Sequence, residues 1–477
     1  MPGAFYANSR LTGITPAEEP DPEATLWVNG STGSDSNTIA QVRAGAGTVA
    51  WATIGRAAWG STTRSSPNTA EAAVAGDVVS IADGTYSAGG FTPSNYLTDN
   101  VYWNPANNGS SGNPIRFQSA GGYGAVTLTN VGGIAALIGA REKDYIIWSG
   151  FNIHEDTAPS ALSHVSQVLW YGSEGGGLED TIMTGNAAGE LETGVIGDNW
   201  SGVRIHSSTG QRIYNCTSVE FGVAFGDENH SGLTTYQGTD LTVEHCDMSR
   251  NGSGIYIKGN LSSPNTAIGY FTIRYNIFED NLDGGIYCFA GATSTDANPC
   301  LIYQNLFKNN QFQGIKLAAL GGQAWDPRYN HFVNNTFIGG EVAYGQYGTI
   351  DNTHVFWNNI CAGQTSSAIY SHFPANLVDT DFEHNDYYNF PDFASLNGVG
   401  QITLATWKAT YTRDTDSPAA ISSDPQFVNA GTGDYHLQGG SPALTQGRVT
   451  RSIGGTNGDT IPAGMYITGS EVIGRVT

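Results

Sequence analysis

The sequence has few charged residues and no long hydrophobic run. Asp, Glu, Lys and Arg make up 13% of its 477 residues. No stretch approaches the roughly 18 apolar residues that cross a bilayer as a helix, so we expect no membrane span. The first residues carry neither an early basic cluster nor an apolar core of signal-peptide length. We therefore expect that a signal was removed or that the protein leaves its cell without one, as virion components do. The predicted location is extracellular or virion-associated.

Basic residues are the scarcer charged class. Lys and Arg number 20 against 43 Asp and Glu, which gives a formal net charge of −23. A strongly acidic surface repels a phosphate backbone, so we expect no nucleic-acid partner. An acidic polysaccharide remains compatible with this charge if basic side chains or bound Ca²⁺ supply cations locally.

Cysteine is also rare. An odd number of cysteines excludes complete pairing within one chain, and the absence of a CxxC pair argues against a zinc site. The five cysteines are Cys216, Cys246, Cys288, Cys300 and Cys361.

Glycine and aromatic residues, by contrast, are abundant. The chain has 63 glycines, and Phe, Trp and Tyr make up 11% of it. Glycine does not recur in triplets, which excludes collagen, and the aromatic residues can bury enough apolar surface to order the chain. Short strands joined by tight turns fit this composition. Residues 1–25 are polar and contain proline, so we expect them to form an arm.

The decisive signal is an internal repeat that begins near residue 211. Segments such as RIYNCTS, TVEHCDM, TIRYNIF and FVNNTFI align on two columns. The first column comprises Cys216, Cys246, Asn276, Asn305, Asn335, Asn359 and Asn385. The second column lies two positions later and comprises Ser218, Met248, Phe278, Phe307, Phe337, Cys361 and Tyr387.

Stacked coils explain these columns. A coil of short strands cannot bury its inner face alone, and stacking places identical positions one strand spacing apart. Asparagines at a turn can then bond one another, and we expect the column cysteines to be buried rather than joined in a disulfide. The sequence predicts an all-β parallel β-helix, a solenoid with about three strands per coil, over residues 26–447. WATIGRAAW predicts a helix that caps its N-terminal end, and we expect an irregular C-terminal cap or tail over residues 448–477.

Both ends of this region resemble a known family. WVNGSTGSDSN, WATIGRAA and GDVVSIADGTYS look like the N-terminal part of right-handed parallel β-helix proteins, and DPQFVNAGTGDYHLQGGSPAL looks like their C-terminal coil. The family includes pectate-lyase-like and alginate-lyase-like enzymes. The resemblance covers roughly residues 26–447 and implies a right-handed solenoid. It implies the reaction less specifically, because the group contains polysaccharide lyases, epimerases, glycoside hydrolases and phage tailspikes.

The resemblance places a substrate groove along the strands that match GIYIKG. Alternate residues of a strand point outward, and aligning GVAFGD with GIYIKG, GIYCFA and GIKLAA gives two outward columns that pass through Ala224 and Gly226. Aromatic faces in these columns would stack on sugars, and cations would hold uronate carboxylates. The predicted substrate-binding residues are Arg204, His206, Tyr287, Lys316, Tyr370, His372 and Asp283.

β-Elimination beside a uronate needs charge stabilisation at the enolate, a base for the C5 proton and an acid for the leaving oxygen. We predict Lys258 as the base, with Tyr256 or His230 as the acid. IYIKGN resembles the lysine-bearing strand of one alginate lyase group. That group has an arginine on the following coil, where this chain has Phe289.

The loop GDENHSG is the densest polar cluster beside the predicted groove. Asp227 and Glu228 supply the oxygen ligands that Ca²⁺ prefers, and we predict them as a calcium site or as acid–base residues. No organic cofactor is expected.

Three functions remain open. The first is a lyase acting on an acidic polysaccharide. The second is a glycoside hydrolase that uses Asp227, Glu228 or Asp283 as acid and base, although the chain lacks the Asp-Asp pair and Gly-His-Gly of polygalacturonases. The third is a virion tailspike or fibre, or another glycan-binding structural protein, without catalysis. A homotrimer, or virion attachment through the N-terminal arm, is compatible with each.

Overall fold

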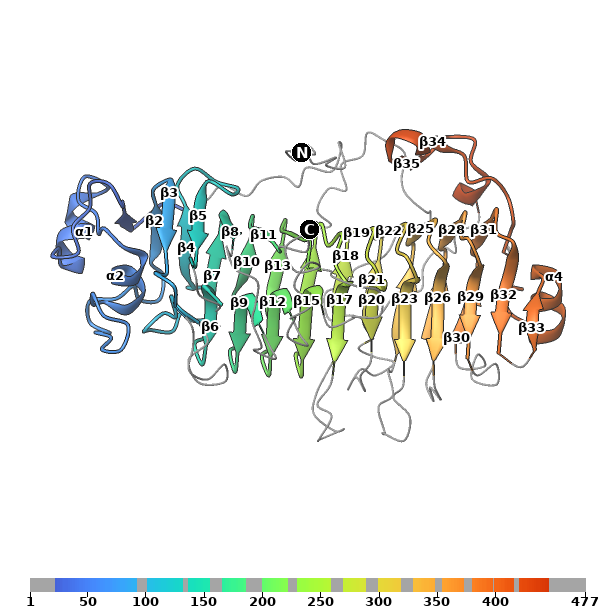
Figure 1. The fold of residues 1–477 in the computed structure, drawn as a ribbon, viewed down its shortest axis with the longest axis horizontal. Helices are drawn as coiled ribbons and strands as arrows, with labels where there is room; N and C mark the ends of the chain where they lie inside the picture. The colour runs from blue at the N-terminus through green and yellow to red at the C-terminus, as the bar shows by residue number, and fades with distance from the viewer. Residues whose placement is uncertain are drawn as a thin grey trace.

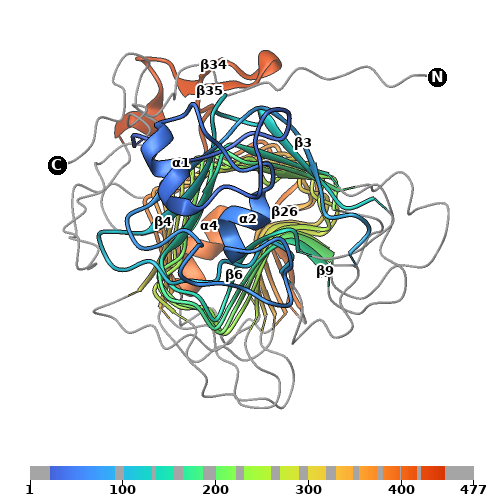
Figure 2. The ribbon, with the colours of Figure 1, turned by 90° about the vertical axis from the view of Figure 1, so that its left-hand side faces the viewer.

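Stacked coils build an elongated solenoid in the computed structural model (Figure 1). Viewed from the N-terminal end, the strands enclose one continuous core (Figure 2). The structure describes residues 22–91, 101–131, 136–154, 165–185, 200–221, 230–258, 269–288, 299–318, 329–347, 354–372, 380–397, 399–415 and 420–445.

The first face of the solenoid is a twelve-stranded parallel sheet. Its strands, in spatial order, are β1 (Leu26–Val28), β2 (Val78–Ile81), β4 (Ile115–Ser119), β7 (Ile146–Ser149), β10 (Gly177–Glu179), β13 (Arg212–Tyr214), β16 (Thr242–Glu244), β18 (Thr272–Arg274), β21 (Cys300–Tyr303), β24 (Asn330–Val333), β27 (His354–Trp357) and β30 (Thr380–Glu383).

The second face consists of two five-stranded parallel sheets joined by single bridges through Asp247. The first sheet contains β3 (Gly84–Ser87), β5 (Val126–Thr129), β8 (Phe151–His154), β11 (Ile182–Thr184) and β14 (Thr217–Val219). The second contains β19 (Ile277–Glu279), β22 (Leu306–Lys308), β25 (Thr336–Ile338), β28 (Ile360–Ala362) and β31 (Asp386–Tyr388).

The third face is an eleven-stranded sheet, parallel except at its last strand. In spatial order it contains β6 (Ile138–Arg141), β9 (Val165–Tyr171), β12 (Trp200–His206), β15 (Ser231–Tyr236), β17 (Ser253–Lys258), β20 (Gly284–Cys288), β23 (Gln313–Ala318), β26 (Val342–Tyr347), β29 (Ser367–Ser371), β32 (Asp392–Leu396) and β33 (Gly400–Ile402). Consecutive strands such as β7, β8 and β9 lie on three different faces, which confirms three strands per coil.

Short helices close the two ends. α2 (Ile54–Trp59) lies across the N-terminal end of the core (Figure 2), and the Thr53 hydroxyl accepts from the Arg56 N–H as its N-cap. This confirms the helix that WATIGRAAW predicts. α1 (Ile39–Gly45) precedes it. At the other end, α4 (Leu404–Thr406) and η2 (Trp407–Tyr411) follow the antiparallel β33, and a hairpin of β34 (Phe427–Asn429) and β35 (Asp434–Leu437) follows with the short turns η3 (Ala430–Thr432) and η4 (Pro442–Thr445).

The asparagine column forms a buried ladder. Each side-chain amide donates from Nδ2 to Oδ1 of the next asparagine, at 3.0 to 3.3 Å, through Asn276, Asn305, Asn335, Asn359 and Asn385. Asn385 then donates to Oδ1 of Asp414 at 2.9 Å. Cys216 and Cys246 occupy the same column as buried free thiols, as predicted.

The second column forms an internal aromatic stack. Phe278, Phe307 and Phe337 lie 4.8 and 4.7 Å apart between ring centroids, with nearly parallel planes. Glycine at the matching position of the eleven-stranded sheet makes room for these rings. A Cβ on Gly314 would lie 2.5 Å from the Phe337 ring, so packing requires glycine at this position.

The predicted arm and tail are only partly covered by the structure. Residues 1–21 and 446–477 lie outside the described residues, so the boundaries of arm, β-helix and cap remain predictions. No helix in the described part of the chain is long and apolar enough to cross a membrane.

The asparagine ladder generates a stability prediction. In Asn305→Ala, the Asn276 amide and backbone N–H lose their acceptor, and Asn335 Oδ1 and the Ile273 carbonyl lose a donor. We expect the free energy of unfolding to fall by about 2–4 kcal/mol, since buried polar groups are left unpaired. Chemical denaturation measures this change. The exposed Asn429→Ala is the matched control, and equal losses in both variants would contradict the ladder's role.

Two buried carboxylates generate a pH prediction. Burial raises the pKa of Asp386 to about 7 and that of Asp414 to about 6, from 3.8. The folded protein therefore keeps protons that the unfolded chain has already lost. We expect the free energy of unfolding to fall as pH rises from about 4 to about 7. Asp386→Asn should flatten much of this slope, because the amide oxygen can still accept from the Ser423 N–H. The exposed Asp240→Asn, which does not act on either buried carboxylate, should keep the slope, and a slope unchanged in Asp386→Asn would refute the assignment.

Candidate functional site

The outer face of the eleven-stranded sheet carries most of the predicted site residues. The sequence alignment that placed Ala224 and Gly226 on this face was wrong for one coil. The strand between β12 and β17 is β15, so Arg204 pairs with Thr234 and His206 pairs with Tyr236. Thr234 and Tyr236 in turn pair with Tyr256 and Lys258. Residues 222–229, which the alignment had used for this coil, lie outside the described residues. Thr234 and Tyr236 therefore take the places assigned to Ala224 and Gly226.

Lys258 lies at the end of β17, half-buried between two tyrosines. Its Nζ lies 5.5 Å from the centre of the Tyr236 ring and 5.3 Å from that of Tyr256. The Arg204 guanidinium lies 4.7 Å from the same Tyr236 ring. Tyr236 therefore contacts both cations, each through a cation–π interaction. The structure brings together Lys258, Tyr256 and Arg204, as the sequence predicted, and adds Tyr236.

Several predicted contact residues are less accessible than alternation along the strands suggested. The exposed fractions are 6% for Arg204, 2% for Tyr256 and 3% for Tyr287. Lys258, Tyr236 and Lys316 are half-buried. A planar sugar face cannot stack on a ring that is almost fully covered, so the half-buried groups are the accessible part of this face.

A row of stacked rings explains the state of His206. The His206 ring lies 4.9 Å from Tyr171 and 6.0 Å from Tyr236, with nearly parallel planes. Burial, with a contribution from the Arg204 charge, lowers the pKa of His206 to about 4. His206 is therefore neutral near pH 7 and does not supply the positive charge expected of it.

A second polar cluster surrounds Lys316. Its Nζ lies 3.9 Å from Asp283 Oδ2 and 3.9 Å from the centre of the Tyr287 ring. Tyr347 lies on the other side, at 5.3 Å, and accepts a hydrogen bond from Gln313 Nε2 through its hydroxyl. Burial raises the pKa of Tyr347, so the phenol stays protonated at neutral pH. Asp283 thus forms an ion pair with Lys316. In the described part of this cluster it does not face a second carboxylate, as the acid and base of a glycoside hydrolase would.

The last two predicted contacts are Tyr370, on β29, and His372, directly after this strand. The Tyr370 ring lies 5.0 Å from Tyr347, and its hydroxyl lies 3.4 Å from Nδ1 of His372. His372 is exposed and its ring lies 6.3 Å from Tyr347. Both residues thus continue the aromatic row toward the C-terminal end of the sheet.

His230 is not brought to Lys258. It is fully buried and lies just before β15, beside the start of β17, whereas Lys258 ends β17. Five residues of extended strand separate the two ends, which is about 16 Å. The predicted calcium ligands Asp227 and Glu228 lie outside the described residues. Among the residues that are described, no group of three His, Cys, Asp or Glu side chains could hold a metal ion.

Sequence reasoning missed Tyr171, Tyr236 and Tyr347. Each ends a strand of the eleven-stranded sheet and each contacts a neighbouring cation or ring. Their common signal is a tyrosine at the last position of a strand, in VSQVLWY, SGLTTY and VAYGQY. The segment SGLTTY lacks the Gly-Ile start of its neighbours, which hid its place in the repeat.

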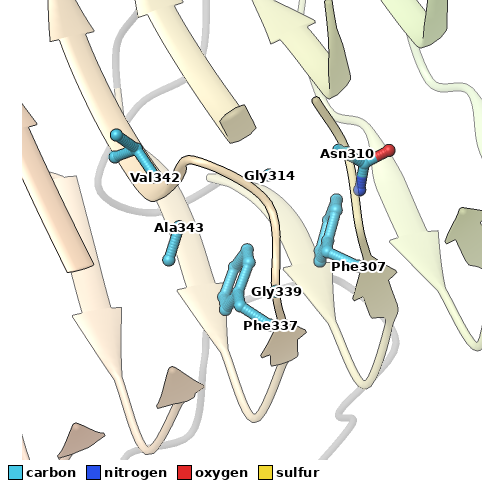
Figure 3. Close-up of a pocket in the computed structure, with 7 residues that line it drawn as sticks. All are labelled: Phe307, Asn310, Gly314, Phe337, Gly339, Val342 and Ala343. Atoms are coloured by element: carbon cyan, nitrogen blue, oxygen red, sulfur yellow. The ribbon is translucent and has the colours of Figure 1, made fainter. Parts of the chain in front are cut away.

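The pocket whose lining residues are drawn in Figure 3 is a packing gap and not a ligand site. It lies between Phe307, Phe337 and Ala343, close to Gly314. It is too narrow to admit a water molecule. No catalytic group lines it, so the search for function stays with the outer face of the sheet.

A family model identifies the central coils. Residues 168–337 match the model described as right handed beta helix region. The chain folds as a right-handed parallel β-helix. The strands of this β-helix extend beyond the matched segment on both sides, from Leu26 to Ile402. No curated protein matches the sequence.

Several solved structures are similar to this β-helix protein. The pectate lyase Pel9A has 13% identity and a TM-score of 0.46, over 88% of this chain and 91% of that one. The PL6 family alginate lyase AlyGC has 15% identity and a TM-score of 0.45 over 68% of this chain. The match spans 43% of the length of AlyGC. The GH136 lacto-N-biosidase from Eubacterium ramulus has 14% identity and a TM-score of 0.46, over 80% of this chain and 66% of that one.

The stacked ring of His206 generates a prediction. Its imidazole should stay neutral down to about pH 5, because the depressed pKa is close to 4. A nuclear magnetic resonance titration, with the signal assigned by its loss in His206→Gln, measures this. Tyr236→Ala should raise the midpoint by opening one side of the ring to water. A midpoint near 6.5 in the unmodified protein would overturn the assignment.

Proposed function

We propose that the protein is a carbohydrate-active depolymerase that cleaves an acidic polysaccharide by β-elimination at uronate residues. The observation that carries this proposal is the set of Lys258, Tyr236 and Arg204 on adjacent strands of one sheet. It combines an amine, a phenol and a fixed cation, which are the three functions that the reaction requires.

The proposed roles follow from position and exposure. Neutral Lys258 removes the proton from C5 of a uronate, which forms the C4–C5 double bond as the C4–O bond breaks. A tyrosine hydroxyl protonates the departing oxygen. Tyr236 is the better placed acid, because it is half-buried whereas Tyr256 is 2% exposed. Arg204 stabilises the negative charge that develops on the carboxylate.

Ca²⁺ at Asp227 and Glu228 stays part of the proposal as an aid to carboxylate binding. Their oxygen ligands suit the ion. No step of the elimination is assigned to it.

The burial of Arg204, Tyr256 and Tyr287 favours a second candidate function. A protein that binds a glycan without cutting it, such as a virion fibre or an adhesin, needs only the half-buried row on the outer face of the sheet. In that case Lys258 would hold a carboxylate rather than remove a proton.

An activity screen tests the proposal. Purified protein is incubated with alginate, pectate, glycosaminoglycans and bacterial capsules, with and without EDTA. We expect ultraviolet absorbance to rise as unsaturated products form. Lys258→Ala should reduce kcat by at least about 100-fold, as expected for loss of a general base. Tyr236→Phe should reduce kcat with little change in KM.

Each outcome of the screen has a distinct reading. New reducing ends without a rise in absorbance would replace elimination by hydrolysis. Full activity of Lys258→Ala would refute its role as base. Binding without either signal would leave the non-catalytic candidate in place. Loss of activity in EDTA alone would support the calcium site.

A further inference from the structure

Cations and tyrosines alternate along the outer face of the eleven-stranded sheet. Lys or Arg occurs on β6, β12, β17 and β23, and on none of the four strands next to them in the order, β9, β15, β20 and β26. Each of those four strands instead carries an outward tyrosine. We name this set the cation–tyrosine row, and its members are Arg141, Tyr171, Arg204, Tyr236, Lys258, Tyr287, Lys316 and Tyr347.

The members of the row contact one another in three groups. Arg141 lies 5.8 Å from the Tyr171 ring, and the Tyr236 ring lies between Arg204 and Lys258. Lys316 lies between Tyr287 and Tyr347. A tyrosine ring offers a quadrupole and not a full opposite charge, so it fixes a cation without cancelling its field.

Two acidic side chains also reach the row. Glu142, 67% exposed, lies 3.5 Å from Arg141, and Asp283 lies 3.9 Å from Lys316. The row still places four cations on one face of a chain that has 20 basic and 43 acidic residues. Arg141 and Lys258 share one column of the sheet, and Arg204 and Lys316 share the column two residues earlier. Arg141, Lys258 and Lys316 are partly accessible, whereas Arg204 is buried and acts through its field.

The spacing of the cations is set by the backbone. Cation-bearing strands are two strands apart, which is about 9.5 Å at the usual spacing of a sheet. This is close to the length of two linked pyranose rings. A linear glycan that crosses the strands along the solenoid axis therefore meets one cation for every two sugars.

We propose that the row recognises a linear acidic glycan with one carboxylate in each disaccharide repeat. The carboxylated sugar lies at a cation-bearing strand, and the other sugar lies at a tyrosine-bearing strand. This inference rests on the proposed function, because it specifies the charge pattern of the polysaccharide that the same face binds.

Binding of two size-matched probes tests the register. One is an octasaccharide of hyaluronan, with a carboxylate on every second sugar, and the other is an octamer of galacturonate, with a carboxylate on every sugar. Isothermal titration calorimetry on the full chain should give at least about fivefold tighter binding of the hyaluronan probe, despite its lower charge. Equal binding, or tighter binding of galacturonate, would overturn the inference, because total charge would then govern affinity.

Variants locate the effect on the row. Arg141→Gln should weaken binding of the hyaluronan octasaccharide by about fivefold, as expected for one charge-assisted contact. Lys316→Gln combined with Asp283→Asn, which removes both members of the ion pair, should do the same. The matched control is Arg250→Gln, an exposed arginine outside the row that pairs with Glu220. Loss of binding in the control and not in the row variants would refute the inference.

The inference and the proposed function can fail separately. Cleavage of galacturonate with no preference for hyaluronan would reject the register and keep the lyase. Tight hyaluronan binding without any cleavage would keep the register and reject the lyase. Absence of binding with both probes would reject the register, and absence of cleavage of every polysaccharide in the activity screen would reject the lyase.

Discussion

The hydrogen bonds between stacked coils are the constraint on which every other feature depends. Parallel pairing fixes each residue directly beside its equivalent one coil away, and the asparagine ladder fixes the turns in the same register. A slip of one residue would turn each strand inside out. It would also separate Asn276 from Asn305 and unstack Phe307 from Phe337. The same register between coils therefore determines both the side-chain columns in the interior and the rows on the outer face.

That shared register explains why the outer face is organised in rows. The geometry that stacks Phe278 on Phe307 inside also stacks Tyr171 on His206 outside. Stacked rings cover one another's faces, so most of these aromatic groups present an edge rather than a face to a ligand. The lysines and arginines that contact these tyrosines therefore determine where positive charge lies along the sheet.

The repeat made the fold and the interior columns predictable, because asparagine and phenylalanine recur at the positions that must touch. The outer face was harder to predict for physical reasons. Alternation shows which way Tyr256 points but not what covers it. The neutral state of His206 comes from neighbours on two other coils. The segment that leads into the eleven-stranded sheet differs in length from coil to coil. Counting from the repeat therefore misplaced the strand of one coil and hid Tyr236. His230, predicted from a polar loop beside the groove, lies just before β15, at the opposite end of the strands from Lys258.

The ladder has a direction, since each amide donates toward the C-terminal end and the last donor meets the Asp414 carboxylate. All internal rungs are equivalent, so a whole coil between Asn276 and Asn385 can be duplicated or lost without altering either terminus of the ladder. The cation–tyrosine row follows a stricter rule, because one extra coil would place two like groups side by side. A solenoid of this design can change length one coil at a time and remain folded, yet only steps of two coils preserve its surface pattern.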